Sequence, residues 1–554
     1  MRPPPAVGTA VHAPRLHGLA VAAVLIMLGN VVSRLLGLVR GQTIGALFGT
    51  SYSADVFNAA NRVPTMVYDL LIGGAITAAL VPVFSEYAER DARRHATTED
   101  PAGDSDLARL AGTVLGLALA VLVPIVALLM AFAEPLMSLL GVGFAPQVQA
   151  QGILLVRLAL PAVVLQGVAA VLMGVLYALH RVSLPSYSAA VYNLAIVVCA
   201  LALTPLLGVT SLVVGILVGA TAQVVLQLPG LRGLRLRPRL DLAHPGVRRI
   251  VRLYAPVAAG LLVSAAVVTL DTRLASQTGE GSLAAMLYAT NLVQFPLGLV
   301  ATALSFAALP VLSRYGQGAG GAREAGFQRT LGLGIRAALL LIVPATVALI
   351  MLRVPIVRLL YERGAFDAAG VDLTALALLY YAPQLPFVAV DQLLIAAFYA
   401  VQNTRLPVLV GVAGAGLYTV VALGTVAHLG MAGLVLANTV QNSAHAVILL
   451  VFLWRLIGTL RPLGLVGATL RVGAAGLLMA ATLLLVQALR PVPEGVIGLI
   501  AYLALAGGSG GLVYLLVLAA LRSEELVYTR DVVLSRLGRF GRRASQVDGG
   551  VPLG

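Results

Sequence analysis

Apolar segments of membrane-spanning length recur along nearly the whole chain, separated by short polar turns. We place fourteen such segments, at residues 17–48, 56–87, 108–132, 152–178, 184–204, 209–230, 250–274, 283–313, 329–352, 372–400, 406–428, 431–457, 465–489 and 495–521. Each is long enough to cross a hydrocarbon core of about 30 Å as a helix. Backbone groups in lipid must find hydrogen-bond partners within the segment, and the sequence lacks the alternation typical of barrel strands. The pattern predicts an all-α, polytopic membrane protein.

The sequence also repeats itself. The matching segments are Pro82–Tyr87 with Pro310–Tyr315, Pro135 and Leu139–Leu140 with Pro355 and Leu359–Leu360, and Tyr177 and Leu184–Pro185 with Tyr399 and Leu406–Pro407, at offsets of 228, 220 and 222 residues. Three matches that agree this closely predict one duplication. We expect an N-terminal six-helix lobe (1–231), a C-terminal six-helix lobe (250–460), an extra helix pair (461–521) and a basic tail (522–554). Because six is even, the two lobes share one orientation, with a pseudo-twofold axis along the membrane normal.

The distribution of charged residues predicts on which side of the membrane the termini lie. The chain of 554 residues is 59% hydrophobic and 11% charged, with a mean hydropathy of +0.96, whereas soluble domains carry about 25% charged residues. All 37 basic residues are arginine, and the net charge is +14. Twenty-six arginines fall at the termini and in the even-numbered loops, against five on the opposite side. The positive-inside rule therefore places both termini in the cytoplasm and explains the basic balance without nucleic acid. The single cysteine, Cys199, favours neither disulfides nor a metal site.

Charged side chains interrupt the first two segments. Arg34 and Arg40 lie in the first, Asp55 precedes the second, and Arg62 follows about two turns later. A charge at bilayer depth costs about 2.5–3.5 kcal/mol on insertion scales, so such groups face a hydrated cavity or a partner. The forked guanidinium groups suit phosphate oxygens, and we expect all four residues to bind substrate in a cavity between the lobes. The alternatives are structural contacts, including a helix-terminal role for Asp55.

The second half carries further polar groups. Asp271 lies beside Arg273 at the end of the seventh segment, Asn291 lies in the eighth and Asp391 in the tenth. We expect Asn291 to face substrate. Because an intramembrane carboxylate can exchange a proton or a cation, Asp271 and Asp391 are candidates for ion coupling, and local pairing is the alternative. A further set, Asn438, Gln441, Asn442 and His445, predicts a polar face on the twelfth segment, which interhelical hydrogen bonding would also explain.

The absence of several sequence motifs narrows the class of function. It has no Walker loop, no nucleotide fingerprint, no filter-like loop and no catalytic arrangement of histidine, serine and carboxylate. A duplicated membrane protein of this kind is typical of transporters that expose a site between two halves alternately to each side. We therefore expect a transporter rather than an enzyme. It would need no cofactor and would be driven by proton or sodium coupling or by the membrane potential.

Several segments resemble the MurJ (MviN) family of bacterial lipid II flippases, in the multidrug/oligosaccharidyl-lipid/polysaccharide exporter superfamily. They are Asn30–Arg40, Ala54–Phe57, Arg62–Pro64, Ala79–Phe84, Leu270–Thr272, Gln294–Gly298 and Ala397–Ala400. The resemblance implies translocation of the undecaprenyl-pyrophosphate-linked peptidoglycan precursor, lipid II, across the bacterial inner membrane for cell-wall biogenesis and cell shape. It implies that Arg34 and Arg40 are cavity arginines and that the last two spans form a lipid-tail groove. It also implies membrane lipids and cell-wall synthesis machinery as partners. We expect a monomer.

The chain departs from the family pattern at two cavity positions. Where many members have an arginine, the second span has Tyr68 and Asp69, and the eighth has Asn291. We expect Arg62 to compensate for this less basic cavity. The polar groups that sodium coupling needs in the eleventh span are reduced here to Tyr418 and Thr419.

Two other transport functions remain open from the sequence, together with one non-transport function. The first is a flippase for another undecaprenyl-linked oligosaccharide. The second is an ion-coupled multidrug exporter, in which Asp271 and Asp391 would dominate and Arg34 would be dispensable. The third is a scaffold that regulates cell-wall synthesis without transport. The short tail after Arg522 does not favour the scaffold.

Overall fold

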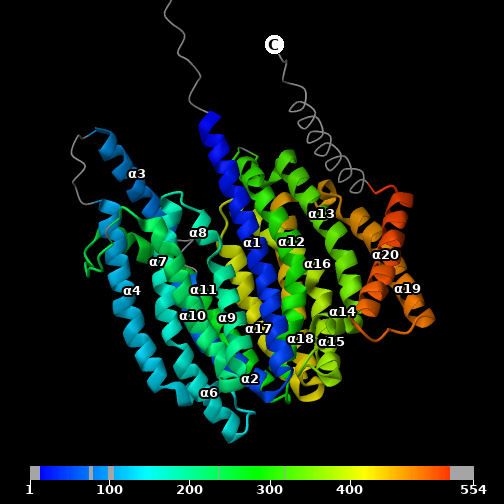
Figure 1. Cartoon of the computed structure of the whole chain (residues 1–554). Coiled ribbons are helices and arrows are strands. Elements are labelled where there is room, and N and C mark those ends of the chain that lie inside the picture. The colour runs from blue at the N-terminus through cyan, green and yellow to red at the C-terminus, as the bar shows by residue number, and fades with distance from the viewer. Residues whose placement is uncertain (1–12, 74–78, 98–104, 235, 319, 524–554) are drawn as a thin grey trace, which may run out of the picture. The chain divides into compact units, whose positions relative to one another are not determined.

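The computed structural model describes residues 13–73, 79–97, 105–234, 236–318 and 320–523. Helices build this part of the chain, and no strand occurs among the described residues (Figure 1). The predicted all-α membrane fold is confirmed. Thirteen described segments are long and apolar enough to cross a membrane, and they correspond to all the predicted spans but the second.

The second predicted span, 56–87, has a more complex structure. It begins as α2 (Tyr52–Tyr68), which is only 17 residues long, and continues as the π-helical turn η1 (Asp69–Gly73). Helix α3 (Val81–Thr97) ends it. Residues 74–78 lie outside the described part of the chain. Pro64 and the wider π-helical turn, which is often found at functional sites, interrupt the regular backbone here.

The described residues form two compact units, Met1–Ala284 with Arg363–Asp367, and Ala285–Glu362 with Ala368–Gly554. The first unit holds α1 (Ala13–Phe48), α2, η1, α3, α4 (Asp106–Ala131), α5 (Ala133–Leu140), α6 (Pro146–Ala159), α7 (Pro161–Ala178), α8 (Ser183–Ser186), α9 (Ser188–Leu207), α10 (Thr210–Gln227), η3 (Leu228–Leu231) and α11 (Pro245–Ala275). The second holds most of α12 (Ser282–Gly316), then η4 (Gly321–Arg323), α13 (Ala325–Met351), α14 (Arg353–Tyr361), α15 (Ala368–Tyr381), η5 (Ala382–Gln384), α16 (Leu385–Ala400), α17 (Arg405–Leu429), α18 (Met431–Ile457), η6 (Arg461–Leu463), α19 (Leu465–Leu489) and α20 (Val496–Ala520).

Backbone irregularities recur at the offset of the sequence repeat. His180 and Gln402, 222 residues apart, both adopt a positive φ, at 57° and 60°. Gly208 and Gly430, also 222 apart, turn the chain between paired helices with φ of 54° and 56°. A proline starts a new helical stretch within each long span, at Pro161 and at Pro383. The two halves therefore share the positions where the chain bends as well as their apolar pattern.

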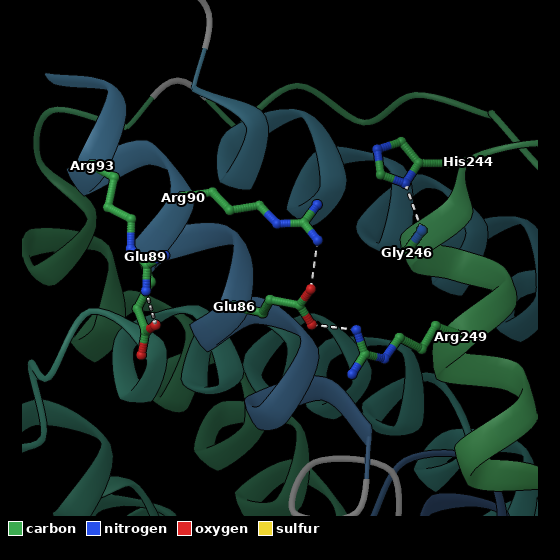
Figure 2. Close-up of polar contacts among 7 residues, drawn as sticks. All are labelled: Glu86, Glu89, Arg90, Arg93, His244, Gly246 and Arg249. Carbon is green, nitrogen blue, oxygen red and sulfur yellow. Dashed lines mark hydrogen bonds and ion pairs between the residues drawn. The ribbon is translucent and has the colours of Figure 1, made fainter. Parts of the chain in front are cut away.

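Helix α11 belongs by sequence to the second repeat but packs in the first unit. Figure 2 shows Glu86 of α3 between two guanidinium groups, those of Arg90 and of Arg249 on α11. One turn further along α11, the Tyr254 hydroxyl donates to the Leu70 carbonyl oxygen in η1. These contacts hold the beginning of α11 to α3 and η1. The lobe boundary at residues 231–250 remains a prediction about the duplication.

Small residues bring helices close together in the first unit. Helices α9 and α10 pack along their length, and a Cβ on Gly215 would lie 2.8 Å from the Ile196 Cα atom. On α4, Gly112 accepts a hydrogen bond from the Arg239 backbone N–H at 3.1 Å, so the 236–240 segment lies directly on that helix. Without a hydrophobic driving force in lipid, close backbone approach of this kind supplies the dispersion contacts that join helices.

The predicted extra pair, α19 and α20, packs on α13 in the second unit. Its core contains Leu340, Met479, Leu483 and Tyr514. The Tyr514 hydroxyl donates to the Leu340 carbonyl oxygen at 2.8 Å, so its polar atom is satisfied inside the apolar core.

The close approach at Gly116 predicts a stability effect. A Cβ there would lie 2.2 Å from the Arg239 carbonyl oxygen. Gly116→Ala should force the segment away and destabilise the protein by about 1–3 kcal/mol, the usual cost of overpacking. Thermal unfolding of the purified chain in detergent measures this. Gly473→Ala on α19, where nothing lies within 4 Å, is the matched control and should lose no stability. Equal midpoints for the two variants would contradict the packing.

Candidate functional site

Helix α1 carries two of the predicted arginines on different faces. It runs unbroken for 36 residues, so Arg34 and Arg40, six residues apart, point about 120° away from each other. The face toward α9 contains Ser33, whose carbonyl oxygen accepts from the Asn193 side-chain amide at 3.3 Å. Arg40, seven residues further, lies on this face. Arg34 lies off this face and is exposed.

Arg40 belongs to a polar cluster formed by four helices of the first unit. Its half-buried guanidinium interacts electrostatically with Tyr192 of α9, whose side chain hydrogen-bonds Gln166 of α7. Tyr68, at the end of α2, lies near the same tyrosine and is followed by Asp69. We name Arg40, Tyr68, Gln166 and Tyr192 the Arg40 cluster. It places a cation among neutral groups that can donate hydrogen bonds, an arrangement that suits an anion.

Tyr192 and Gln166 are not among the residues predicted for the site. A signal was present, because the polar pair Tyr192–Asn193 interrupts an apolar span as the arginines do. Their convergence on Arg40 depends on the packing of α7 and α9 with α1, which lies more than a hundred residues earlier in the chain.

The second helix places Asp55 and Arg62 on one face, seven residues apart. Seven residues are about 10.5 Å along a helix, too far for a direct ion pair. Asp55 is buried, with 1% exposure, and Arg62 is half-buried. Further along this face, Met66 accepts a weak hydrogen bond from Thr269 of α11 through its sulfur, at 3.9 Å.

Asp55 caps a helix other than its own. Its carboxylate oxygens accept from the backbone N–H groups of Gly281 and Ala284, at 2.7 and 2.8 Å, where α12 begins. In return, the Glu280 carboxylate accepts from the Tyr52 N–H at 3.0 Å, where α2 begins and Ser51 makes no side-chain cap. We call these contacts the reciprocal caps. Tyr52 and Glu280 are 228 residues apart, so the caps join equivalent helix starts of the duplicated sequence.

The remaining predicted residues lie on three further helices. Asp271 is half-buried near the end of α11 in the first unit. In the second unit, Asn291 of α12 lies in hydrogen-bonding reach of Tyr361, whose ring packs against Tyr288 with centroids 5.0 Å apart. Burial raises the pKa of the Tyr361 phenol, so this group stays protonated.

Asp391 lies on α16 and pairs with His445 of α18, Oδ1 to Nδ1, at 2.7 Å. Beside it, the Asn442 amide donates to Gln384 at 2.5 Å and to Asn438 at 3.0 Å. The polar residues of α18 therefore reach η5 and α16 through side-chain hydrogen bonds. Their coupling role stays a prediction.

An apolar cavity of about 260 Å³ lies elsewhere in the first unit, between η1, α4, α7 and the beginning of α11. Leu71, Val121, Val171 and Tyr254 are among its lining residues, and none of the predicted site residues lines it. Among the described residues, no group of three or more histidine, cysteine or acidic side chains could hold a metal ion.

The duplicated helices, the proline-broken spans and the charged groups in membrane helices define a class, the secondary transporters built from parallel repeats. Within that class, the chain belongs to the MurJ lipid II flippase family. A family model described as "Lipid II flippase MurJ" matches residues 44–504.

Relatives and solved structures agree with this assignment. "Probable lipid II flippase MurJ" of Vibrio cholerae is 30% identical over 406 residues, 71% of this chain and 74% of that protein. "Lipid II flippase MurJ" of Burkholderia cenocepacia is 30% identical over 431 residues, 76% of this chain and 81% of that protein. A MurJ structure in an inward closed conformation has a TM-score of 0.71 at 20% identity, covering 92% of this chain and 100% of that one. An inward-facing multidrug transporter of the MATE family has a TM-score of 0.64 at 16% identity, covering 77% and 95%. These two likenesses show the fold.

The reciprocal caps predict a stability effect. Asp55→Ala removes the acceptor of two buried N–H groups and should cost about 1–3 kcal/mol, the usual penalty of leaving such groups unsatisfied. Asp55→Asn, which keeps one acceptor oxygen, should cost less. Thermal unfolding in detergent measures both. Glu134→Ala, at an exposed acid in the first turn of α5, is the matched control. If Asp55→Ala unfolds at the same temperature as this control, the caps do not stabilise the fold.

Proposed function

We propose that this protein translocates lipid II from the inner to the outer leaflet of the bacterial cytoplasmic membrane by alternating access. The observation that carries the proposal is the match of the MurJ family model over residues 44–504. The Arg40 cluster supports it, because a cation beside hydroxyl and amide groups suits a diphosphate. Transport of this kind needs no covalent chemistry, which agrees with a protein that is a transporter and not an enzyme.

The pyrophosphate would be held by arginine side chains. Arg40 would bind it together with Tyr192, and Arg34 and Arg62 would contact it from other faces of α1 and α2. Charge-assisted hydrogen bonds are about twice as strong as neutral ones, and their strength increases where water is excluded. Asn291, where many family members have an arginine, would contribute an uncharged contact. The hydrophobic tail would lie along α19 and α20, whose outward faces include Leu470, Leu477 and Leu484.

Alternating access requires contacts that exist in only one of the two states, because a ligand shifts an equilibrium only through differential binding. The reciprocal caps are suited to this role. They engage both oxygens of Asp55, so we place this residue in a gate and expect it to meet the substrate only when the caps are open. Breaking the caps exposes helix N-termini, which attract anions.

The arginine distribution and the family support a proposal for the membrane topology and the partners of the protein. We infer a multi-pass protein with both termini in the cytoplasm, working as a monomer with membrane lipids and the cell-wall synthesis machinery as partners. No cofactor is needed. Asp271 and Asp391 are the groups we assign to ion coupling, alongside the membrane potential.

One alternative has an observation in its favour. The fold also resembles a MATE multidrug transporter, with a TM-score of 0.64. In an ion-coupled exporter, Asp271 and Asp391 would dominate and Arg34 would be dispensable. A flippase for another undecaprenyl-linked oligosaccharide would use the same diphosphate contacts. The two flippases would be distinguished by a transport assay that compares lipid carriers with different glycans.

Neutralising the arginines tests the assignment. In cells depleted of the native protein, variants Arg34→Ala and Arg40→Ala should move lipid II to the outer leaflet at least about tenfold more slowly. The reason is that a hydrogen bond to a charged group is worth about 1.5–3 kcal/mol. Labelling of outer-leaflet lipid II measures the rate. Arg93→Ala removes one charge from an exposed pair with Glu89 and should leave transport unchanged (Figure 2). Normal translocation in the Arg34→Ala, Arg40→Ala double variant would exclude the mechanism.

A further inference from the structure

Three helices of the second unit meet at one histidine. His445 of α18 has its Nδ1 atom 2.7 Å from the Asp391 carboxylate on α16, and its Nε2 atom 3.3 Å from the Pro407 carbonyl oxygen on α17. Both side chains of the pair are only 16% exposed. Gly411, one turn after Pro407, lies next to the ring: a Cβ there would be in ordinary contact with Nε2, at 3.9 Å.

The two partners of this ring decide its protonation. A neutral imidazole has one N–H donor and one acceptor nitrogen. An ionised Asp391 and the carbonyl oxygen are both acceptors, so beside an ionised Asp391 the ring completes both contacts only as an imidazolium that donates from both nitrogens. The pair with the proton bound, an imidazolium beside a carboxylate, is electrically neutral overall. After loss of one proton it has a charge of −1, and one ring nitrogen directs a lone pair at an oxygen.

The polar side chains next to the Asp391–His445 pair are uncharged. Gln384, Asn438 and Asn442 next to it are neutral amides hydrogen-bonded to one another. Helix α12 also contacts α16, through hydrogen bonds from Thr302 and Ser305 to Gln392. The charged and titratable side chains on the helices around the pair are Arg314 of α12, Arg329 and Arg336 of α13, Asp372 of α15, Arg405 and His428 of α17 and Arg455 of α18, together with Tyr288, Tyr315, Tyr380, Tyr381, Tyr399 and Tyr418. The hydrogen-bond partners of the ring are the Asp391 carboxylate and the Pro407 carbonyl oxygen. Loss of the proton would leave the Asp391 charge between membrane helices with no other ion pair among the described residues, which is costly.

We propose that Asp391 and His445 form a proton-binding site that couples transport to a proton gradient through the first turn of α17. The proposal rests on the proposed transport function and names its coupling ion. Sodium does not suit this site, because the imidazolium already neutralises the Asp391 carboxylate and would repel a second cation. Release of the proton to water breaks the Nε2 contact with Pro407, so α17 must repack against α16 and α18. The gradient thereby biases a conformational equilibrium.

The protonation state is tested without any transport assay. The full-length protein, labelled with ¹⁵N-histidine in lipid bilayers at pH 8, is compared with His445→Gln and His428→Gln by solid-state NMR. An ordinary histidine is neutral at that pH. The signal lost in His445→Gln should be an imidazolium with both nitrogens protonated, and the signal lost in His428→Gln, at an exposed position of α17, gives the spectrum of a second histidine for comparison. A neutral ring at His445 would overturn the proposal.

The coupling is tested by lipid II translocation in proteoliposomes with and without a pH gradient. Wild type and His428→Gln should respond to the gradient, and His445→Gln and Asp391→Asn should lose that response. An unchanged response in folded His445→Gln would overturn the coupling. If the wild type moves no lipid II while His445 is an imidazolium, the transport assignment fails and the proton site stands. If His445→Gln does not fold, loss of the gradient response in Asp391→Asn decides the coupling.

Discussion

A polar group inside a membrane protein needs a partner from the protein itself, and this constraint organises the whole structure. Water is absent from the hydrocarbon core, so an unpaired N–H or carboxylate there costs several kcal/mol. The reciprocal caps show how the chain meets this demand. Asp55 satisfies the free N–H groups at the start of α12, and Glu280 does the same for α2. Two helix starts that would otherwise be unsatisfied are joined by the groups that satisfy them.

The duplication provides two similar helix frameworks with different polar contents. In the first unit, Tyr192 on α9 packs against Gly219 on α10. At the equivalent positions, 222 residues later, Gly414 on α17 faces Gln441 on α18, so the large and small residues have changed places. Both helix pairs, α9 with α10 and α17 with α18, pack closely because one of the two facing residues is a glycine in each pair.

The two units also differ in the polar groups that they bring together. The first unit gathers a cation with hydroxyl and amide groups around Arg40, and the second gathers Asp391 and His445 with neutral amides. A diphosphate needs the former, and a proton can be held by the latter. In the mechanism that we propose, one lobe supplies the anion contacts and the other the proton site, although the two share a sequence repeat.

The sequence alone determined the membrane-spanning helices, their near-complete number and the duplication. These properties depend on apolar length, on proline and on repeated short motifs, all of which are local. It also marked Arg40, Asp55 and Asp391 as exceptional, because each is a charge within or beside an apolar stretch. Their partners were decided only by the tertiary structure: Gly281 and Glu280 meet α2 from more than 220 residues away, and His445 meets Asp391 across 54. Side chains from distant helices come together through packing, and no local pattern in the chain encodes which faces will meet.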